Sequence, residues 1–299
     1  MPSTQRDEAP ALSMDEAPET GSLERWAWDY IVTTEIGLKL QPPEAPQTLP
    51  DASCGSIRPM RPIRRVRPGR PPELEVTKKS RVPKRGLRGE RTRARLLHAF
   101  AHHELQAAEL MCWALLAFPE APDELRRGLH RIALDEIRHL DLYRQQIERL
   151  GFYFGAFPVR DWFWERVPRV RTIMEFLAVM GMGLEGANLD HSAAFARRFR
   201  AVGDEESAEV QEIIGRDEIE HVRFGVRWFR ALQQLESKGG DGGQDDEFDR
   251  WAALLPAPLS PMLMRGSTIA RRSRLEAGLS PAMVDRLERW KSDDPAPGS

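Results

Sequence analysis

The chain has 299 residues, 41% of them hydrophobic, and a formal net charge of -2, which favours a soluble globular protein of one large or two small domains. No run approaches the ~18 apolar residues that a membrane span needs, and the acidic, proline-containing first thirty residues do not resemble a secretory signal. We therefore expect a cytoplasmic protein without a membrane segment. Cys54 and Cys112 lie far apart, so neither a disulfide framework nor a cysteine metal site is indicated.

The N-terminal ninety residues divide into a tail, a helix and an arm. Residues 1–22 are rich in Pro, Glu, Ser and Thr and lack periodic apolar positions, so we predict a disordered tail. Residues 23–40 have the apolar spacing of one short amphipathic helix. Many prolines between 42 and 83 then impose an extended path. Residues 23–90 are therefore expected to form a helix and an arm that wraps the remaining protein.

The arm is strongly basic. Residues 58–95 contain fifteen Lys and Arg against three Glu, so this segment carries +12 and the remainder of the chain -14. Such an arm can bind nucleic acid or another anionic surface, and it can equally pack on its own acidic protein. Nucleic acid is the less favoured partner, because the arm lacks interleaved aromatic residues and any recognised reading motif.

Residues 91–236 are predicted to form an all-α four-helix bundle. Apolar residues recur at helical spacing over four long stretches, at 91–118, 123–150, 170–201 and 204–236. Asp123 is a candidate cap for the second helix, and Gly203-Asp204 marks the turn before the fourth. Both turns are short, whereas the aromatic, proline-containing connection at 151–169 is long enough to run the length of a helix. This pattern is typical of two antiparallel hairpins joined by one long crossover.

The C-terminal part of the chain is expected to be a small helical addition. Residues 237–247 contain GGDGGQDDE and are predicted to be a flexible linker. A cap and tail follow over 248–299, where Ser280 and Pro281 have the residue types of an N-cap and a first helical position.

One five-residue pattern, DEIxH, occurs on both the second and the fourth predicted helix. It places Glu136 three residues before His139 and Glu218 three residues before His221. On a helix this spacing puts both side chains on one face, where they can bind a single ion from one side. A single Glu-x-x-His motif occurs on many solvated helices, and two copies could still be two exposed faces, although repetition with the preceding Asp weakens that alternative.

The helical wheel favours inward positions for both motifs. On the second helix the stripe that contains them comprises Leu129, Ile132, Ala133, Leu140, Tyr143 and Ile147, and on the fourth it comprises Ile214, Val222, Gly225, Phe229 and Leu232. A buried carboxylate without a compensating charge costs several kcal/mol, and neither stripe contains Lys or Arg. Metal ions would supply that charge.

The first and third helices each supply one matching inward acid. Glu104 aligns with the apolar stripe of the first helix and Glu185 with that of the third. Glu104 precedes Glu136 by 32 residues and Glu185 precedes Glu218 by 33, which indicates an internal repeat of two hairpins. Glu109 is the competitor on the first helix, but it lies ~140° around the helix from Glu104. We therefore prefer Glu104 and keep Glu109 as the alternative.

Four carboxylates carry a charge of -4, which two divalent ions would neutralise. Oxygen ligands combined with imidazole suit iron, or manganese, better than zinc. Di-iron carboxylate bundles use one Glu from each of two helices and Glu-x-x-His from each of the other two. Asp135 and Asp217 could accept hydrogen bonds from the ligand histidines, although ordinary surface positions explain them equally well.

The chain resembles the ferritin-like superfamily and, within it, the uncharacterised family labelled "domain of unknown function 455". The resemblance extends over most of residues 25–290 and includes HAFAHHELQAAELMCWALLAFPEAP (98–122), RPGRPPEL (67–74) and ARRSRLEAGL (270–279). It implies a ferritin-like bundle of the di-iron carboxylate type, with Glu136 and Glu218 as bridging ligands. The implied ligand set is Glu104, Glu136, His139, Glu185, Glu218 and His221. It implies no substrate.

Several further residues near the predicted site have two interpretations. His98, His102 and His103 lie near Glu104 in sequence but not on its inward stripe, so a supporting or proton-relay role is the weaker alternative. Tyr143 could be a redox-active or hydrogen-bonding phenol, although core packing is the more common role. Trp162, Phe163 and Trp164 could line a substrate pocket or simply cover the bundle. Cys112 is expected to be an inert core thiol.

These observations favour a metal-dependent oxidoreductase that activates dioxygen or peroxide on an unknown substrate. The alternatives are a metal-stabilised binding or scaffold protein that uses its basic arm, a ferroxidase or iron-handling protein, and a metal-free bundle. A storage cage is disfavoured because the arm, the linker and the cap would obstruct the packing of bundles. No reductase motif is present, so turnover that requires reduction would need an external electron donor.

Overall fold

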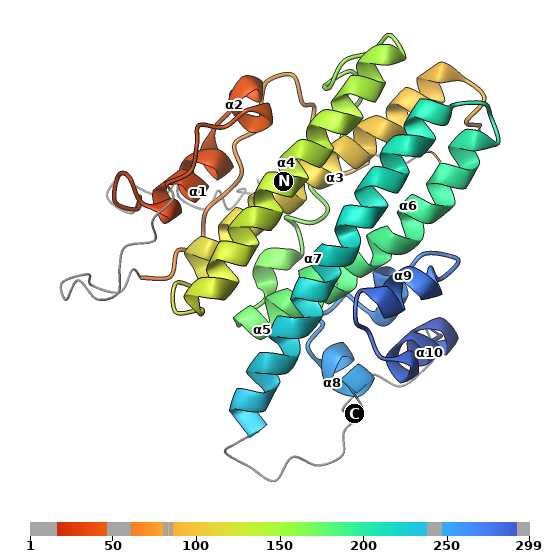
Figure 1. Ribbon diagram of the computed structural model, residues 1–299. Helices are drawn as coiled ribbons and strands as arrows, with labels where there is room; N and C mark the ends of the chain where they lie inside the picture. The colour runs from red at the N-terminus through yellow and green to blue at the C-terminus, as the bar shows by residue number, and fades with distance from the viewer. Residues whose placement is uncertain (1–16, 47–60, 80–82, 84–85, 238–246, 292–299) are drawn as a thin grey trace, which may run out of the picture.

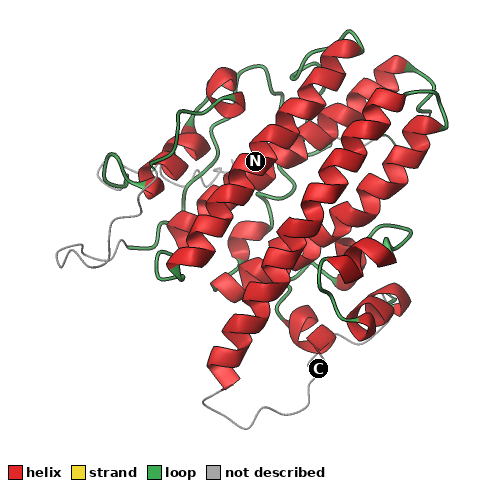
Figure 2. Ribbon diagram, in the orientation of Figure 1, coloured by secondary structure: helices red, strands yellow, loops and turns green. Residues whose placement is uncertain are grey.

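The computed structural model describes residues 17–46, 61–79, 83, 86–237 and 247–291 (Figure 1). Within these ranges the regular structure is helical (Figure 2), and one isolated β-bridge pairs Val76 with Val159. None of the described helices is long and apolar enough to cross a bilayer. Most of the predicted disordered tail (1–22) and flexible linker (237–247), together with Cys54, lies outside the described residues.

Four long helical segments lie side by side (Figure 1). Helix α3 (Glu90–Ala117) packs along α4 (Asp123–Arg149), α6 (Glu185–Arg200) packs along α7 (Glu205–Ser237), and α4 contacts α7. The third segment also includes α5 (Ile173–Phe176) and a π-helix (Leu177–Leu184). The two hairpins are joined by the predicted crossover, which contains a short 3-10 helix at Val167–Arg169.

The predicted helix ends agree with the structure to within three residues, and one predicted cap is wrong. Asp123 is the first residue of α4 instead of its cap; Pro122 occupies the N-cap position and provides no side-chain hydrogen bond. Helix α7 begins after Asp204, whose Oδ1 accepts a hydrogen bond from the Ser207 backbone N–H. Gly203 provides the positive φ of +78° that this tight turn requires.

The π-helix ends at Leu184, directly before Glu185, and lies against α7 at a pair of glycines. A Cβ added to Gly181 would be 3.0 Å from the Gly225 Cα, so the two backbones approach more closely than side chains permit. Helical periodicity did not predict this wider turn. The close packing at Gly181 and Gly225 fixes the third segment against α7 next to the residues of the candidate site.

The N-terminal region forms two helices, not the single helix predicted for 23–40. Helix α1 (Leu23–Val32) packs on α3, and α2 (Ile36–Leu40) follows a break at residues 33–35. The chain turns back because the buried Lys39 Nζ donates to the carbonyl oxygens of Tyr30 and Ile31 at the end of α1, at 2.6 and 3.0 Å. A lysine in this position satisfies carbonyl groups that have no partner within the helix.

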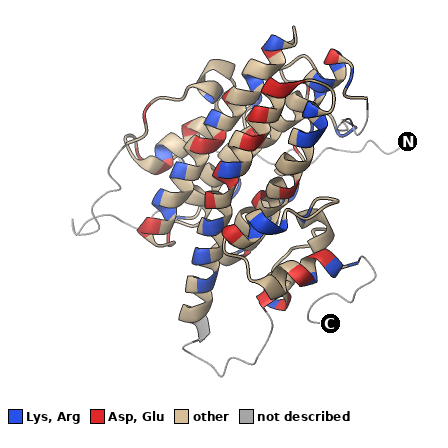
Figure 3. Ribbon diagram, turned by 45° about the vertical axis from the view of Figure 1, so that its right-hand side comes forward, with Lys and Arg blue, Asp and Glu red and all other residues tan. Residues whose placement is uncertain are grey.

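Helices α8 (Glu247–Ala253), α9 (Arg271–Glu276) and α10 (Pro281–Arg289) and a 3-10 helix at Pro261–Met264 form the C-terminal addition. Ser280 caps α10 as predicted, because its side chain accepts from the Met283 backbone N–H. A buried ion pair between Arg274 of α9 and Asp190 of α6, 2.8 Å long, anchors this addition to the third long segment. Elsewhere, acidic and basic residues are interspersed along the long helices (Figure 3).

The glycine contact provides a test of this packing. In Gly225→Ala the new Cβ would lie 2.8 Å from the Gly181 carbonyl carbon, so the π-helix and α7 must separate. We expect a loss of at least the ~1–3 kcal/mol that overpacking typically costs, measured by urea unfolding. In the control Gly37→Ala, a Cβ meets nothing within 4 Å, so stability should be unchanged or slightly higher. Equal effects of the two substitutions would contradict this account.

Candidate metal centre

The six residues predicted as ligands come together at the centre of the four long segments. Suitable ligand atoms of Glu104, Glu136, His139 and Glu218 all lie within 4.8 Å of one another. The same is true of Glu136, Glu185, Glu218 and His221. Each long segment contributes at least one of these side chains, and Glu136 and Glu218 belong to both groups.

This cluster is inaccessible to bulk water. Glu136, His139 and Glu218 are fully buried, and the other three residues are at most 5% exposed. Apart from the partly buried Leu232, the apolar residues predicted to share the inward stripes of α4 and α7 are buried as well. The alternative of two exposed helix faces is therefore wrong. Side chains of this kind are almost never fully buried unless they are paired or coordinate a metal.

Burial and mutual repulsion dominate the electrostatics of the glutamates. Burial raises the pKa of Glu104 well above its usual value, and the neighbouring Glu136 carboxylate raises it further. The pKa of Glu185 is raised by burial and by Glu218. Glu136 behaves differently: burial opposes its ionisation, but hydrogen bonds from His139 and His221 lower its pKa overall. In the metal-free protein the imidazoles supply the positive charge that this cluster needs.

The polar atoms of the cluster are not fully satisfied by the described residues. Among these residues, Glu185 Oε1 is buried without a partner. Glu136 Oε1 and Glu218 Oε2 both face one atom, His221 Nδ1, at 3.0 and 3.3 Å. The free energy cost of leaving one buried polar group unsatisfied is ~1–3 kcal/mol, and more for a charged group. A buried carboxylate oxygen without a partner, beside two carboxylates that share one imidazole nitrogen, is the arrangement expected of a site that takes a ligand.

Each histidine is oriented by the aspartate of the other motif. The Nε2 atom of His139 on α4 lies 3.2 Å from Asp217 Oδ2 on α7, and His221 Nε2 lies 3.3 Å from Asp135 Oδ2. Arg138 bridges the two aspartates, at 2.7 Å from Asp217 and 3.6 Å from Asp135. These carboxylates fix a proton on Nε2 of each ring and leave Nδ1 on the side of the glutamates. Of the two interpretations that the sequence left open, these contacts favour the acceptor role for both aspartates, and they cross between the two hairpins.

Glu109, the alternative to Glu104, belongs to a separate ion cluster. Its carboxylate accepts from Lys39 Nζ at 2.7 Å, from both terminal nitrogens of Arg70 at 2.6 and 2.9 Å, and from Trp164 Nε1 at 2.7 Å. Burial alone would raise the pKa of Glu109, but Arg70 and Lys39 lower it. Glu109 therefore ties α2, the arm and the crossover to α3, and it is absent from the groups that could hold a metal ion.

The three histidines before Glu104 also hold the crossover. His98 Nε2 accepts from the Gly155 backbone N–H at 2.7 Å, His102 Nε2 lies 3.0 Å from Asp161 Oδ1, and His103 stacks on Phe163. Because none of them belongs to the candidate metal groups, their main structural role is to attach the loop to α3. Their positions on the helical wheel had shown only that they avoid the inward stripe.

Tyr143 and Cys112, for which the sequence suggested possible roles, are both buried. The Tyr143 hydroxyl accepts a hydrogen bond from Gln211 Nε2 at 2.8 Å in the buried interior. Burial raises its pKa well above the usual value, and Glu104 raises it further. Cys112 is a buried free thiol whose pKa is raised by burial.

The cluster predicts a characteristic pH dependence of stability for the metal-free protein. Burial lowers the pKa of His139, but hydrogen bonds to Asp217 and Glu136 outweigh this and raise it to about 9. In the unfolded chain histidine titrates near ~6.5, so the folded state binds more protons between these pH values. The contribution of this histidine to the free energy of unfolding is therefore complete below pH ~6.5 and is lost as the pH rises to 9. The loss is at most ~1.4 kcal/mol per pH unit for each histidine.

We therefore expect the melting temperature of chelator-treated protein to fall between pH 6.5 and 9. The raised pKa values of His221, Glu104 and Glu185 act in the same direction. With saturating Mn²⁺ the decline should disappear, because a bound cation takes the place of the protons and binds more tightly as the pH rises. A metal-free melting temperature that stays level or rises over this range would contradict the electrostatic description.

Comparison with known proteins identifies the family without identifying a reaction. The model of the family described as "Protein of unknown function (DUF455)" matches residues 37–285. An "Uncharacterized protein" of Haemophilus influenzae is 32% identical over 161 residues, which cover 51% of this chain and 56% of that protein. The match thus spans about half the length of this relative. No solved structure matches the chain. Because the family model covers most of the sequence, the protein belongs to the DUF455 family.

Proposed function

We propose that this protein is a ferritin-like four-helix bundle that binds two divalent metal ions at Glu104, Glu136, His139, Glu185, Glu218 and His221. The observation that carries the proposal is the overlap of two four-residue groups in Glu136 and Glu218. A pair of metal ions bridged by carboxylates requires two ligand groups that have carboxylates in common. A single metal ion would require only one ligand group. The preferred metal is iron, with manganese as the alternative.

The residues present fit such a pair of ions in charge and in donor type. Four carboxylates and two neutral imidazoles carry -4, which two divalent ions balance. Among the described residues, none of the four glutamates forms an ion pair with a Lys or Arg, and Glu185 Oε1 has no hydrogen-bond partner. Oxygen and imidazole donors without thiolate suit iron or manganese.

The reaction class we propose is oxidation with dioxygen or peroxide, on a substrate that the site alone does not specify. When bound, the iron would supply the redox chemistry. The protein supplies orientation and exclusion of water: Asp135 and Asp217 hold the protons on the far side of His221 and His139. Asn188 donates to Glu218 Oε1 at 2.8 Å and fixes one of the shared carboxylates. An external electron donor would be required for turnover that consumes reducing equivalents.

Metal analysis tests the site directly. We expect two iron or manganese ions per chain in protein loaded anaerobically with Fe²⁺ or with Mn²⁺. Glu136→Ala should lose most of both ions, because this carboxylate belongs to both groups. Glu124→Gln, which alters an exposed acid of the same helix, should retain them. A wild-type protein without metal, whose melting is unchanged by Glu136→Ala and His221→Ala, would refute the assignment.

Exposure of the loaded protein to oxygen separates the functional classes. If the Fe²⁺ form does not react with dioxygen or peroxide, the metal has a structural role and the scaffold alternative is favoured. Size-exclusion chromatography addresses iron storage, since a particle of about 24 subunits, the size of a ferritin cage, would contradict the proposed oxidoreductase.

The aspartates provide a second, graded test of the site. Asp217→Asn should weaken metal affinity about 10- to 100-fold, the usual effect of removing a hydrogen bond behind a ligand histidine. Asp141→Asn is the matched control, because Asp141 lies on α4 but pairs with Arg144 at the surface. Competition with a fluorescent chelator measures both affinities. Identical affinities would show that the contact between His139 and Asp217 does not support a metal ligand.

A further inference from the structure

The basic arm and the crossover form one continuous surface on the side of α3 that faces away from the metal centre. Arg64 donates to the carbonyl oxygens of Val170 and Arg171, at 3.1 and 2.8 Å. Further along, the Thr77 backbone N–H donates to Val159, and the Val159 N–H donates to Glu75. Two segments about a hundred residues apart in sequence therefore present their side chains together.

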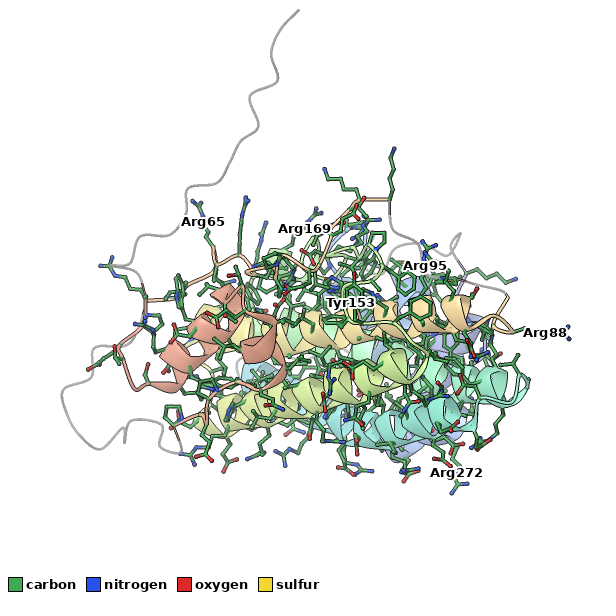
Figure 4. All side chains as sticks on the ribbon, turned by 90° about the horizontal axis from the view of Figure 1, so that it is seen from above. Arg65, Arg88, Arg95, Tyr153, Arg169 and Arg272 are labelled. Atoms are coloured by element: carbon green, nitrogen blue, oxygen red, sulfur yellow. The ribbon has the colours of Figure 1, made fainter. Side chains whose placement is uncertain are left out.

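Exposed cations dominate this surface, which we call the basic face. Its exposed members are Arg61, Arg65, Arg67, Lys78, Lys79, Arg88, Arg91, Arg95, Arg169 and Arg171. Figure 4 shows Arg65, Arg95 and Arg169 on one side of the molecule, Arg88 at one end of it and Arg272 on the opposite side. Two nearby acids are already engaged, Asp161 with Arg70 and Glu165 with Arg160 and Arg166. Arg70 and Arg93 pair with acids of the remaining protein, and the exposed acids of the arm, Glu73, Glu75 and Glu90, are fewer than these ten exposed cations. The basic face therefore keeps an excess of positive charge.

The crossover contributes aromatic residues to this surface, which the arm itself lacks. Tyr153 is 62% exposed, and in the view of Figure 4 it lies over the ribbon, below Arg169 and Arg95. Arg91 lies over the rings of the partly buried Phe152 and the buried Phe157, so Tyr153 is the exposed ring of these three. A planar ring beside exposed guanidinium groups is a stacking platform for a nucleic acid base.

A small pocket opens beside these residues, with a volume of about 280 Å³. Its walls include Arg95, His102, Arg160, Trp162 and Phe163. This volume is at the lower limit of the ~300–1,000 Å³ typical of ligand pockets, so it suits a single ring system. His102 is 1% exposed, and its Nδ1 has no hydrogen-bond partner among the described residues. His102 Nε2 lies 3.0 Å from Asp161 Oδ1, a contact that holds the imidazole in the pocket wall.

We propose that the basic face binds single-stranded nucleic acid, with phosphates on the exposed arginines, one base on Tyr153 and another base in the pocket. A bilayer is the less suitable occupant, since Val76 and Tyr153 are the large apolar residues exposed on this face within the described ranges. His102 and Glu104 lie ~200° apart around α3, so this binding site is separate from the metal centre. The proposal does not depend on the proposed oxidation.

The experiment measures fluorescence anisotropy of labelled single-stranded RNA and DNA of about twelve nucleotides, with the full-length protein. A triple variant, Arg65→Gln, Arg88→Gln and Arg169→Gln, should weaken binding about tenfold or more and reduce the slope of log affinity against log salt by about 2. The matched control carries Arg131→Gln, Arg227→Gln and Arg272→Gln, three exposed cations outside the basic face. It should bind like the wild type.

Substitution of the aromatic residue separates nucleic acid from other anionic ligands. Tyr153→Ala should weaken binding about 5- to 150-fold, which corresponds to ~1–3 kcal/mol for one stacked base. Its exposed position makes it a variant that folds, which thermal melting verifies. The proposal is overturned if both triple variants bind equally or if Tyr153→Ala has no effect. It is also overturned if vesicles with 30% phosphatidylserine bind as tightly as the oligonucleotides, or if a mononucleotide competes at the same concentration as the strand.

Discussion

Four glutamates buried within a few ångströms of one another are the constraint on which the rest of this structure depends. Their mutual repulsion is strong in a medium that excludes water, because the interaction between charges grows as the effective dielectric constant falls. Among the described residues, two imidazoles, those of His139 and His221, lie close enough to offset it. A rigid frame is therefore needed to hold the carboxylates together, and the frame must come from residues outside the cluster. Short turns, the glycine contact between the π-helix and α7, and the anchored C-terminal helices all serve this purpose.

Helix α3 illustrates how that frame is built, because it is polar on two sides. Glu104 faces the cluster, while His98, His102, Gln106 and Glu109 bind the crossover and the arm. The spacing of three or four residues places these four on one stripe. Gln106 Oε1 accepts a hydrogen bond from the Phe163 backbone N–H at 3.0 Å. On this stripe Gln106 lies between the two histidines and Glu109. The layer outside α3 is thus attached by hydrogen bonds and ion pairs in addition to the apolar packing of buried residues such as Val66, Val159 and Val167.

The sequence predicted the parts of the fold that repeat. Helical periodicity located the four long segments, and the DEIxH motifs with matched glutamates predicted which six side chains meet. Features that depend on a single contact were not predictable in this way. The break between α1 and α2 follows from Lys39 turning back to α1, and a local pattern contains no sign of that distant geometry. The π-helix also escaped prediction, because its extra residue per turn shifts the register without changing the residue types. Glu109 could be separated from Glu104 by its angle on the wheel, but its partners Lys39 and Arg70 were 70 and 39 residues away in sequence.

The reciprocal contacts between the two DEIxH motifs have a consequence for the order of assembly. Neither hairpin contains the aspartate that orients its own histidine, since Asp217 serves His139 and Asp135 serves His221. A nascent chain that has completed only α3 and α4 therefore presents an unaligned imidazole and half of the carboxylates. On the proposed function, high-affinity capture of a metal ion would have to wait until the second hairpin has docked. Such an order would delay metallation until the protein is nearly complete, and it would limit the time during which an exposed half-site could retain the wrong ion.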